Sequence, residues 1–99
     1  MPEATVILRN ASGLHARPAK IFSRAAAAHV AEVSVEKDGR RVNAKSVLSL
    51  LTLDCHQGDE IVISTEGDDA EATLGELVAL VEAKLGESEA ESEGGGQVT

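Results

Sequence analysis

Polar and apolar residues alternate along two short segments of the chain, residues 3–9 and 31–37, and this period of two predicts strands that each bury one face. Residues 40–44 and 60–66 form the third and fourth segments that we expect to be strands. In the first of them, Ala4, Val6 and Leu8 share one side. Asp38-Gly39 separates the second segment from the third. This pair favours a tight turn, so we expect these two strands to form a hairpin.

Apolar residues recur every three or four positions in three other segments, which is the spacing of helices with one buried face. Residues 16–29 contain two such rows, one of Ile21, Ala25 and Ala28 and one of Phe22, Ala26 and Val30. Residues 46–53 predict a short helix with Ser46 as its N-cap. A third helix has five apolar residues on one face: Leu74, Leu77, Val78, Val81 and Leu85. Asp68 and Glu71 resemble a capping arrangement at its start.

The elements follow one another in the order β-α-β-β-α-β-α, which predicts an α+β fold. Strands with one apolar face favour an antiparallel or mixed sheet with the helices on a single side. We assign residues 1–86 to one folded domain. Residues 87–99 are acidic and then rich in glycine. We expect a disordered tail there, because such a segment cannot bury enough apolar surface to offset its ordering entropy.

The 99 residues carry a formal net charge of −8, but the charge is distributed unevenly. The segment between Ala4 and Ala31 has no acidic residue and four basic ones: Arg9, Arg17, Lys20 and Arg24. Phe22 is the only aromatic residue, whereas nucleic-acid binders usually combine a basic face with aromatic residues that stack on bases. We therefore expect no nucleic-acid partner. The basic segment suits a phosphate group or an acidic protein.

Three further features of the chain bear on its compartment. No segment approaches the roughly 18 apolar residues of a membrane span. The first residues, MPEATVILRN, lack the basic segment and the apolar run of a secretory signal. Cys55 is the only cysteine, so no internal disulfide can form. We expect a cytoplasmic protein that does not insert into a membrane.

The segment SGLHARPA, residues 12–19, has the features of a helix start with a histidine beside it. Proline is tolerated in the first turn of a helix, so Pro18 places the start near Ala16 and places His15 at the N-cap. The first N–H groups of a helix lack partners within it and favour an anion, to which Arg17 can add a charge-assisted bond. Histidine can act as a nucleophile. The segment therefore suits a transient phosphohistidine, and the alternative is a surface histidine without a role.

Two stretches carry a resemblance to a known family. NASGLHARPA at residues 10–19 and NAKSVLSLLTL at residues 43–53 make the chain similar to HPr, the histidine-containing phosphocarrier of the bacterial phosphoenolpyruvate-dependent sugar phosphotransferase system. The resemblance spans about residues 3–86 and implies an open-faced β-sandwich, with a four-stranded antiparallel sheet and three helices on one face. It also implies that His15 accepts a phosphoryl group on Nδ1 from enzyme I and passes it to sugar-specific IIA proteins or domains.

The same resemblance implies roles for other residues. Ser12, Ala16 and Arg17 match the surroundings of the phosphoryl group. Ser46 matches a position that an HPr kinase/phosphorylase modifies in many relatives, and a phosphate there is expected to hinder docking of enzyme I. The expected docking surface for partner proteins consists of five residues: Lys20, Arg24, Val47, Leu48 and Leu51. The chain would be a monomeric carrier that needs no cofactor and is not a stand-alone catalyst.

Other functions stay open on the sequence alone. A regulatory, nitrogen-type phosphotransfer chain would use His15 without sugar transport, and a corepressor would act on a transcriptional regulator through phosphorylated Ser46. Cys55 and His56 could suggest a hydrolase, but adjacent side chains in extended backbone point to opposite sides. We expect Cys55 to be a small buried residue. The three histidines and the cysteine show no close metal-ligand spacing, so we expect no metal site.

Overall fold

The computed structural model describes residues 2–83 and 85, which form four strands and three helices. In chain order the elements are β1 (Glu3–Ile7), α1 (Ala16–Ala27), β2 (Glu32–Lys37), β3 (Arg40–Asn43), α2 (Val47–Leu51), β4 (Glu60–Glu66) and α3 (Ala70–Glu82). The predicted order of elements is confirmed. The tail predicted at residues 87–99 lies outside the described residues. No helix in the described part of the chain is long and apolar enough to cross a bilayer.

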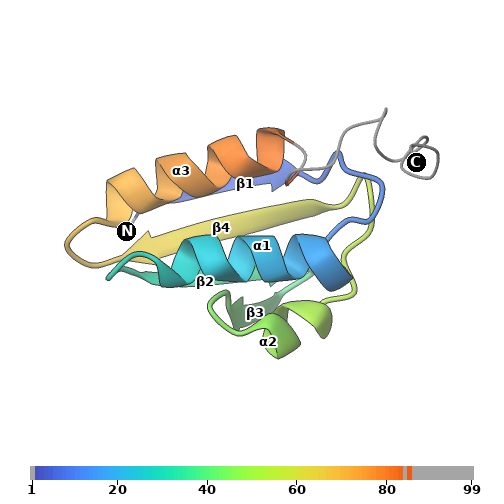
Figure 1. Cartoon of the computed structure of the whole chain (residues 1–99), viewed down its shortest axis with the longest axis horizontal. Coiled ribbons are helices and arrows are strands. Elements are labelled where there is room, and N and C mark those ends of the chain that lie inside the picture. Colours follow the sequence, from blue (N-terminus) through green and yellow to red (C-terminus); the bar gives the residue numbers. More distant parts are fainter. Residues whose placement is uncertain (1, 84, 86–99) are drawn as a thin grey trace, which may run out of the picture.

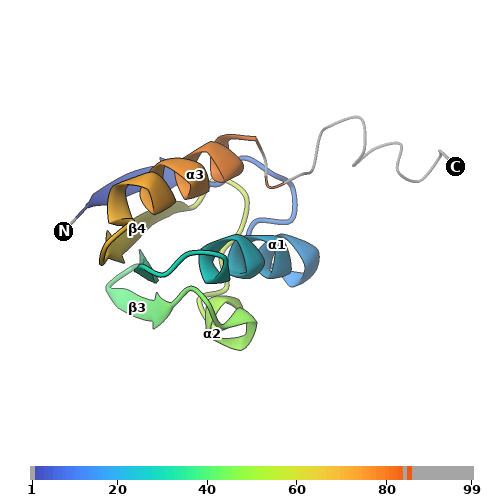
Figure 2. The ribbon, with the colours of Figure 1, turned by 60° about the vertical axis from the view of Figure 1, so that its left-hand side comes forward.

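The strands form one sheet in the order β1-β4-β2-β3, and every neighbouring pair is antiparallel. The register aligns the apolar positions across the sheet: Val6 lies opposite Ile61, and Ile63 lies opposite Val35. The helices cover one face of the sheet, with α1 and α3 running along the strands (Figures 1 and 2). The open-faced α+β sandwich is therefore confirmed.

Several helix ends differ from the prediction. The helix α2 ends at Leu51 rather than at residue 53, and α3 ends at Glu82, so Leu85 lies beyond it. The helix α1 ends at Ala27, so Val30 lies beyond it and is 79% exposed rather than part of a buried row. Asp69, not Asp68, is the N-cap of α3, and its side chain makes no cap hydrogen bond. Instead, Asp69 Oδ1 accepts a hydrogen bond from the amide of Ala31 at 2.9 Å. The Asp69 carboxylate thus ties the start of α3 to the start of β2.

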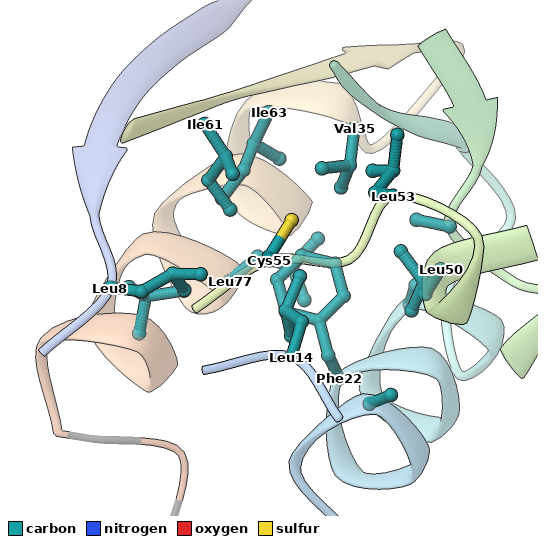
Figure 3. Close-up of a cluster of buried hydrophobic side chains, with 14 of the residues drawn as sticks. Leu8, Leu14, Phe22, Val35, Leu50, Leu53, Cys55, Ile61, Ile63 and Leu77 are labelled. Carbon is teal, nitrogen blue, oxygen red and sulfur yellow. The ribbon is translucent and has the colours of Figure 1, made fainter. Parts of the chain in front are cut away.

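The core is aliphatic around the single aromatic ring of Phe22, which is fully buried. Figure 3 shows Cys55 within this cluster, among Leu14, Phe22 and Leu77. The prediction that Cys55 is a small buried residue is confirmed. Burial raises the pKa of the Cys55 thiol to about 11, so the reactive thiolate is scarce near neutral pH. A hydrolase that uses Cys55 as its nucleophile is therefore not supported.

His29 joins the end of α1 to α3 through two carboxylates, and we call His29, Asp69 and Glu76 the clasp. The ring atom Nε2 lies 2.8 Å from Glu76 Oε1, and Nδ1 lies 3.3 Å from Asp69 Oδ2. The bond with Glu76 raises the pKa of His29 above its ordinary value, burial opposes this in part, and the bond with Asp69 adds to it. On the other side of the residue, Lys45 Nζ donates to the His29 carbonyl at 2.9 Å.

Raising the pH is expected to weaken the clasp. Because the pKa of His29 is raised in the folded chain, its contribution to stability is complete below the ordinary value of 6.5 and is lost as the pH rises through the folded-state value. Urea denaturation of the wild type and of His29→Gln at about pH 5.5 and about pH 8 measures this effect. The difference in unfolding free energy between the two proteins should be larger at the lower pH. The same difference at both pH values would contradict the prediction.

Candidate functional site

His15 lies at the start of α1, as the sequence predicts. It is the N-cap residue, with φ −108° and ψ 153°, and its side chain makes no cap hydrogen bond. The N–H groups of Ala16 and Arg17 belong to the first turn of α1, where a helix offers no internal acceptor. The His15 side chain is 36% exposed. An anion that reaches the ring therefore meets the positive end of the helix dipole.

The loop before His15 packs tightly against residues 54–58. The amide of Leu14 donates to the Cys55 carbonyl at 3.1 Å, and the amide of Gly58 donates to the Leu8 carbonyl at 2.7 Å. Gly13 has φ +57°, and a Cβ at this position would overlap the Cys55 carbonyl and come within 2.7 Å of His56 Cα. Figure 1 shows the two loops at the same end of the molecule. This close approach of main chains sets the position of His15.

Ala16 has φ +50°, in the left-handed region that residues with a Cβ seldom adopt. That conformation costs about 1–2 kcal/mol, and it persists only where the surrounding structure determines it. Here the buried residues Leu14 and Pro18 anchor the chain on either side of Ala16. The strain lies next to His15, at the junction between the loop and α1.

The side chain that contacts the His15 ring is a carboxylate, not a cation. Nε2 of His15 lies 3.1 Å from Asp54 Oδ1, and Nδ1 lies 3.2 Å from the Ser12 carbonyl oxygen. The same Asp54 oxygen lies 3.1 Å from His56 Nε2, and the two rings meet edge to face with centroids 4.9 Å apart. The hydrogen bond with His15, followed by the one with His56, holds the pKa of Asp54 below its ordinary value.

A polar network positions the loop that carries Asp54 and His56. Lys37 Nζ donates to the Asp54 carbonyl at 2.8 Å and pairs with Asp59 Oδ2 at 3.1 Å. The His56 amide donates to Asp59 Oδ2 at 2.8 Å. This amide and Lys37 together lower the pKa of Asp59. Asp59 therefore stays ionised, and the loop after α2 keeps its shape beside His15.

Sequence reasoning did not link Asp54 and His56 to His15. The contact between Asp54 and His15 joins residues 39 positions apart. The pair depends on the return of the chain from α2 to β4, which passes beside the loop before α1. Asp54 and His56 are separated by one residue, but nothing in the sequence around them indicates that His15 lies beside them.

The other residues predicted around the phosphoryl group surround His15 in different ways. The carbonyl oxygen of Ser12 contacts the His15 ring and also accepts a hydrogen bond from the His15 amide at 3.2 Å. Arg17 is exposed, and it forms no ion pair with any of the described residues. Its guanidinium is thus available to an anion. Lys20 and Arg24 are exposed farther along α1.

Ser46 is the N-cap of α2, as predicted, and its Oγ accepts a hydrogen bond from the Ser49 amide at 3.2 Å. Of the three apolar residues predicted for docking, Leu48 is 76% exposed. Val47 and Leu51 are partly buried and pack against the core. The helix α2 packs beside α1 (Figure 1). Leu48 is thus the most exposed apolar side chain of α2.

Comparison with known proteins places these features in a family. A family model described as the PTS HPr component phosphorylation site matches residues 2–83. The phosphocarrier protein HPr of Streptomyces coelicolor is 48% identical over 82 residues, which cover 82% of this chain and 88% of that protein. The crystal structure of HPr-C-His from Thermoanaerobacter tengcongensis has a TM-score of 0.86 and 43% identity, and the match covers 89% of this chain and 99% of that one. Crh, the catabolite repression protein of Bacillus subtilis, crystallised as a dimer with a swapped domain; its match has a TM-score of 0.68 and 37% identity and covers 85% of this chain and 97% of that one.

Proposed function

Because the chain belongs to the HPr family of phosphocarriers, we propose that it accepts a phosphoryl group on His15 from enzyme I and passes it to sugar-specific IIA proteins or domains. The observation that carries this proposal is an accessible imidazole at the start of α1, next to the first amides of the helix and to Arg17. The protein acts as a carrier between two partners and is not a catalyst on its own.

The two hydrogen-bond acceptors at the ring decide which nitrogen can attack. A neutral imidazole carries one N–H, so His15 donates either from Nδ1 to the Ser12 carbonyl or from Nε2 to Asp54. In the second form Nδ1 keeps its lone pair, which faces the Ser12 carbonyl oxygen, so the ring must turn away from that oxygen before Nδ1 can reach phosphorus. Nδ1 then attacks the phosphorus atom of the phosphorylated enzyme I, a new N–P bond forms, and the bond from phosphorus to the donor breaks. Asp54 thus supports the tautomer that attacks.

The groups at the start of α1 stabilise the transferred group without trapping it. The phosphoryl oxygens meet the amides of Ala16 and Arg17 and the Arg17 guanidinium. A negative charge at a helix start gains only about 0.3–1 kcal/mol at an exposed position. Modest stabilisation suits a carrier, because the group must leave for the next acceptor as readily as it arrives.

Reconstitution of the phosphoryl chain tests this function. The protein is mixed with enzyme I and labelled phosphoenolpyruvate, and a IIA protein is added afterwards. We expect label to enter the chain only with enzyme I, to survive alkali but not acid as an N–P bond does, and to move to the IIA protein. A chain that takes no label from a phosphorylated enzyme I that labels a control HPr would contradict the proposal.

We also propose that phosphorylation of Ser46 by an HPr kinase/phosphorylase regulates the carrier. A phosphate adds about −1.5 to −2 charges near neutral pH, and the start of α2 can accommodate it. Ser46 directly precedes the helix that carries the exposed Leu48, so the added charge lies at the expected docking surface. We expect ATP and the kinase to introduce acid-stable phosphate in the wild type but not in Ser46→Ala, and to slow labelling by enzyme I. Equal incorporation into both proteins would exclude this site.

A regulatory role without sugar transport is the second candidate, and the similarity to Crh favours it. The same reconstitution separates the two candidates, since a carrier for sugar transport delivers its label to a sugar-specific IIA protein. We propose that the carrier acts as a monomer. Sedimentation analysis tests this, because a swapped dimer like that described for Crh would have twice the mass of one chain.

A further inference from the structure

Three side chains that could bind a cation converge beside the start of α1. Asp54 Oδ1 lies 3.1 Å from Nε2 of His15 and 3.1 Å from Nε2 of His56, and the three atoms all lie within 4.8 Å of one another. The side chains of Asp54 and His56 are 74% and 60% exposed, so an ion in solution can reach them. When neither Nε2 carries a proton, three electron-rich atoms face one another, and a cation between them relieves the repulsion.

The spacing of these atoms suits a small divalent ion. Zinc binds histidine nitrogen and carboxylate oxygen at about 2.0–2.2 Å, which places neighbouring ligand atoms of a tetrahedral site about 3.4 Å apart. The two distances of 3.1 Å from Asp54 are already close to that separation. The two histidine nitrogens, which lie within 4.8 Å of each other, would need to approach each other through side-chain rotations.

The surroundings hold these side chains in the way that metal ligands are usually held. A ligating histidine commonly donates its other N–H to a carbonyl or a carboxylate, and Nδ1 of His15 lies 3.2 Å from the Ser12 carbonyl. The backbone of Asp54 and of His56 is fixed by Lys37 and Asp59, respectively. The two loops are joined by the hydrogen bond between Leu14 and Cys55. The site is therefore built from main chain that is already in place.

We propose that His15, Asp54 and His56 bind a divalent transition-metal ion of the zinc class, with water completing its coordination. Two imidazoles and one carboxylate favour Zn²⁺ over Mg²⁺ or Ca²⁺, which prefer oxygen ligands. Binding of the ion releases any proton held at Nε2 of either ring. An ion on Nε2 of His15 withdraws electron density from the ring and adds bulk where enzyme I docks. Zinc therefore inhibits phosphoryl transfer, a consequence that rests on the proposed function.

Calorimetric titration with zinc chloride and histidine NMR spectra test the site directly. We expect one ion per chain, with the ring signals of His15 and His56 shifting together and those of His29 unchanged. His56→Ala should bind zinc at least about tenfold more weakly, because even the loss of a hydrogen-bond partner of a metal ligand costs about 10–100-fold in affinity. His29→Ala should bind zinc like the wild type. Magnesium chloride should give no such shifts. Zinc that leaves both rings unshifted, or that binds His56→Ala as tightly as the wild type, would overturn the proposal.

A second measurement tests the inhibition. The rate of labelling by enzyme I is measured with and without zinc, and for each protein the rate with zinc is divided by the rate without it. A control HPr first shows that zinc does not act on enzyme I. The ratio should fall in the wild type, recover when a chelator is added, and fall less in His56→Ala. If the ratio stays at one while the titration shows binding, the inhibition is wrong. Absence of any labelling at His15 would instead contradict the proposed function, and calorimetry and NMR would still decide the metal site.

Discussion

A chain in which alanine replaces His15 is expected to take no phosphoryl group from enzyme I. The alanine side chain has no nucleophile, and the Cys55 thiol cannot replace the imidazole because it is buried with a raised pKa. His56 lies close by, but it belongs to the loop after α2 and does not lie at the start of α1. The expected effect is complete loss of label rather than a slower rate.

His29→Gln serves as the matched control for this experiment. His29 lies beyond the C-terminal end of α1, in the clasp with Asp69 and Glu76, and thus away from the start of the helix. Labelled phosphoenolpyruvate and enzyme I should label this variant like the wild type. Thermal melting shows whether each variant is folded. Label that persists in folded His15→Ala would remove His15 as the acceptor.

Replacing Gly13 by alanine is expected to destabilise the fold by about 2–5 kcal/mol. The left-handed conformation costs an alanine about 1–2 kcal/mol, and overpacking typically costs about 1–3 kcal/mol more. The new Cβ would meet the main chain of Cys55 and His56, which cannot move aside as a flexible side chain would. The loop must therefore separate from residues 54–58, so contact between His15 and Asp54 should also be lost.

Gly39→Ala isolates the steric part of this effect. Gly39 also has a positive φ, +84°, but a Cβ there would have no atom within 4 Å. Urea denaturation should therefore show a clearly smaller loss for Gly39→Ala than for Gly13→Ala. Histidine NMR spectra should show the change at His15 only in the Gly13 variant. Equal losses of stability in the two variants would mean that the close approach of main chains at Gly13 does not contribute to the free energy of unfolding.

The features that depend on neighbours in the sequence could be predicted. Alternation in β2, the turn at Asp38-Gly39 and the N-cap at Ser46 are local, and the structure confirms each of them. The position of His15 at the start of α1 follows from Pro18 in the same way. These signals need only the conformational preferences of a few consecutive residues.

The ends of two helices could not be predicted, because tertiary contacts decide them. The periodicity of α1 continues to Val30, but the chain turns at Ala28 so that β2 can join the sheet. Asp69 rather than Asp68 is the N-cap of α3, and its carboxylate binds the amide of Ala31. The turn at Ala28 and the bond between Asp69 and Ala31 cannot be inferred from the local pattern of apolar residues.

The surroundings of His15 were predicted in part. Arg17 and the first amides of α1 follow from the sequence around the histidine. Asp54 and His56 do not, because they come from a loop that only the packing of Gly13 against Cys55 brings to the site. The sequence led us to expect basic groups around the ring, so the Asp54 carboxylate that contacts it was not predicted.

Peptide mapping of the labelled chain tests the central claim most directly. Trypsin separates the three histidines, since His15 falls in residues 10–20, His29 in residues 25–37, and His56 together with Ser46 in residues 46–84. Digestion at alkaline pH preserves the N–P bond after labelling by enzyme I. We expect the label in peptide 10–20. Label in either of the other two peptides, with none in 10–20, would contradict it.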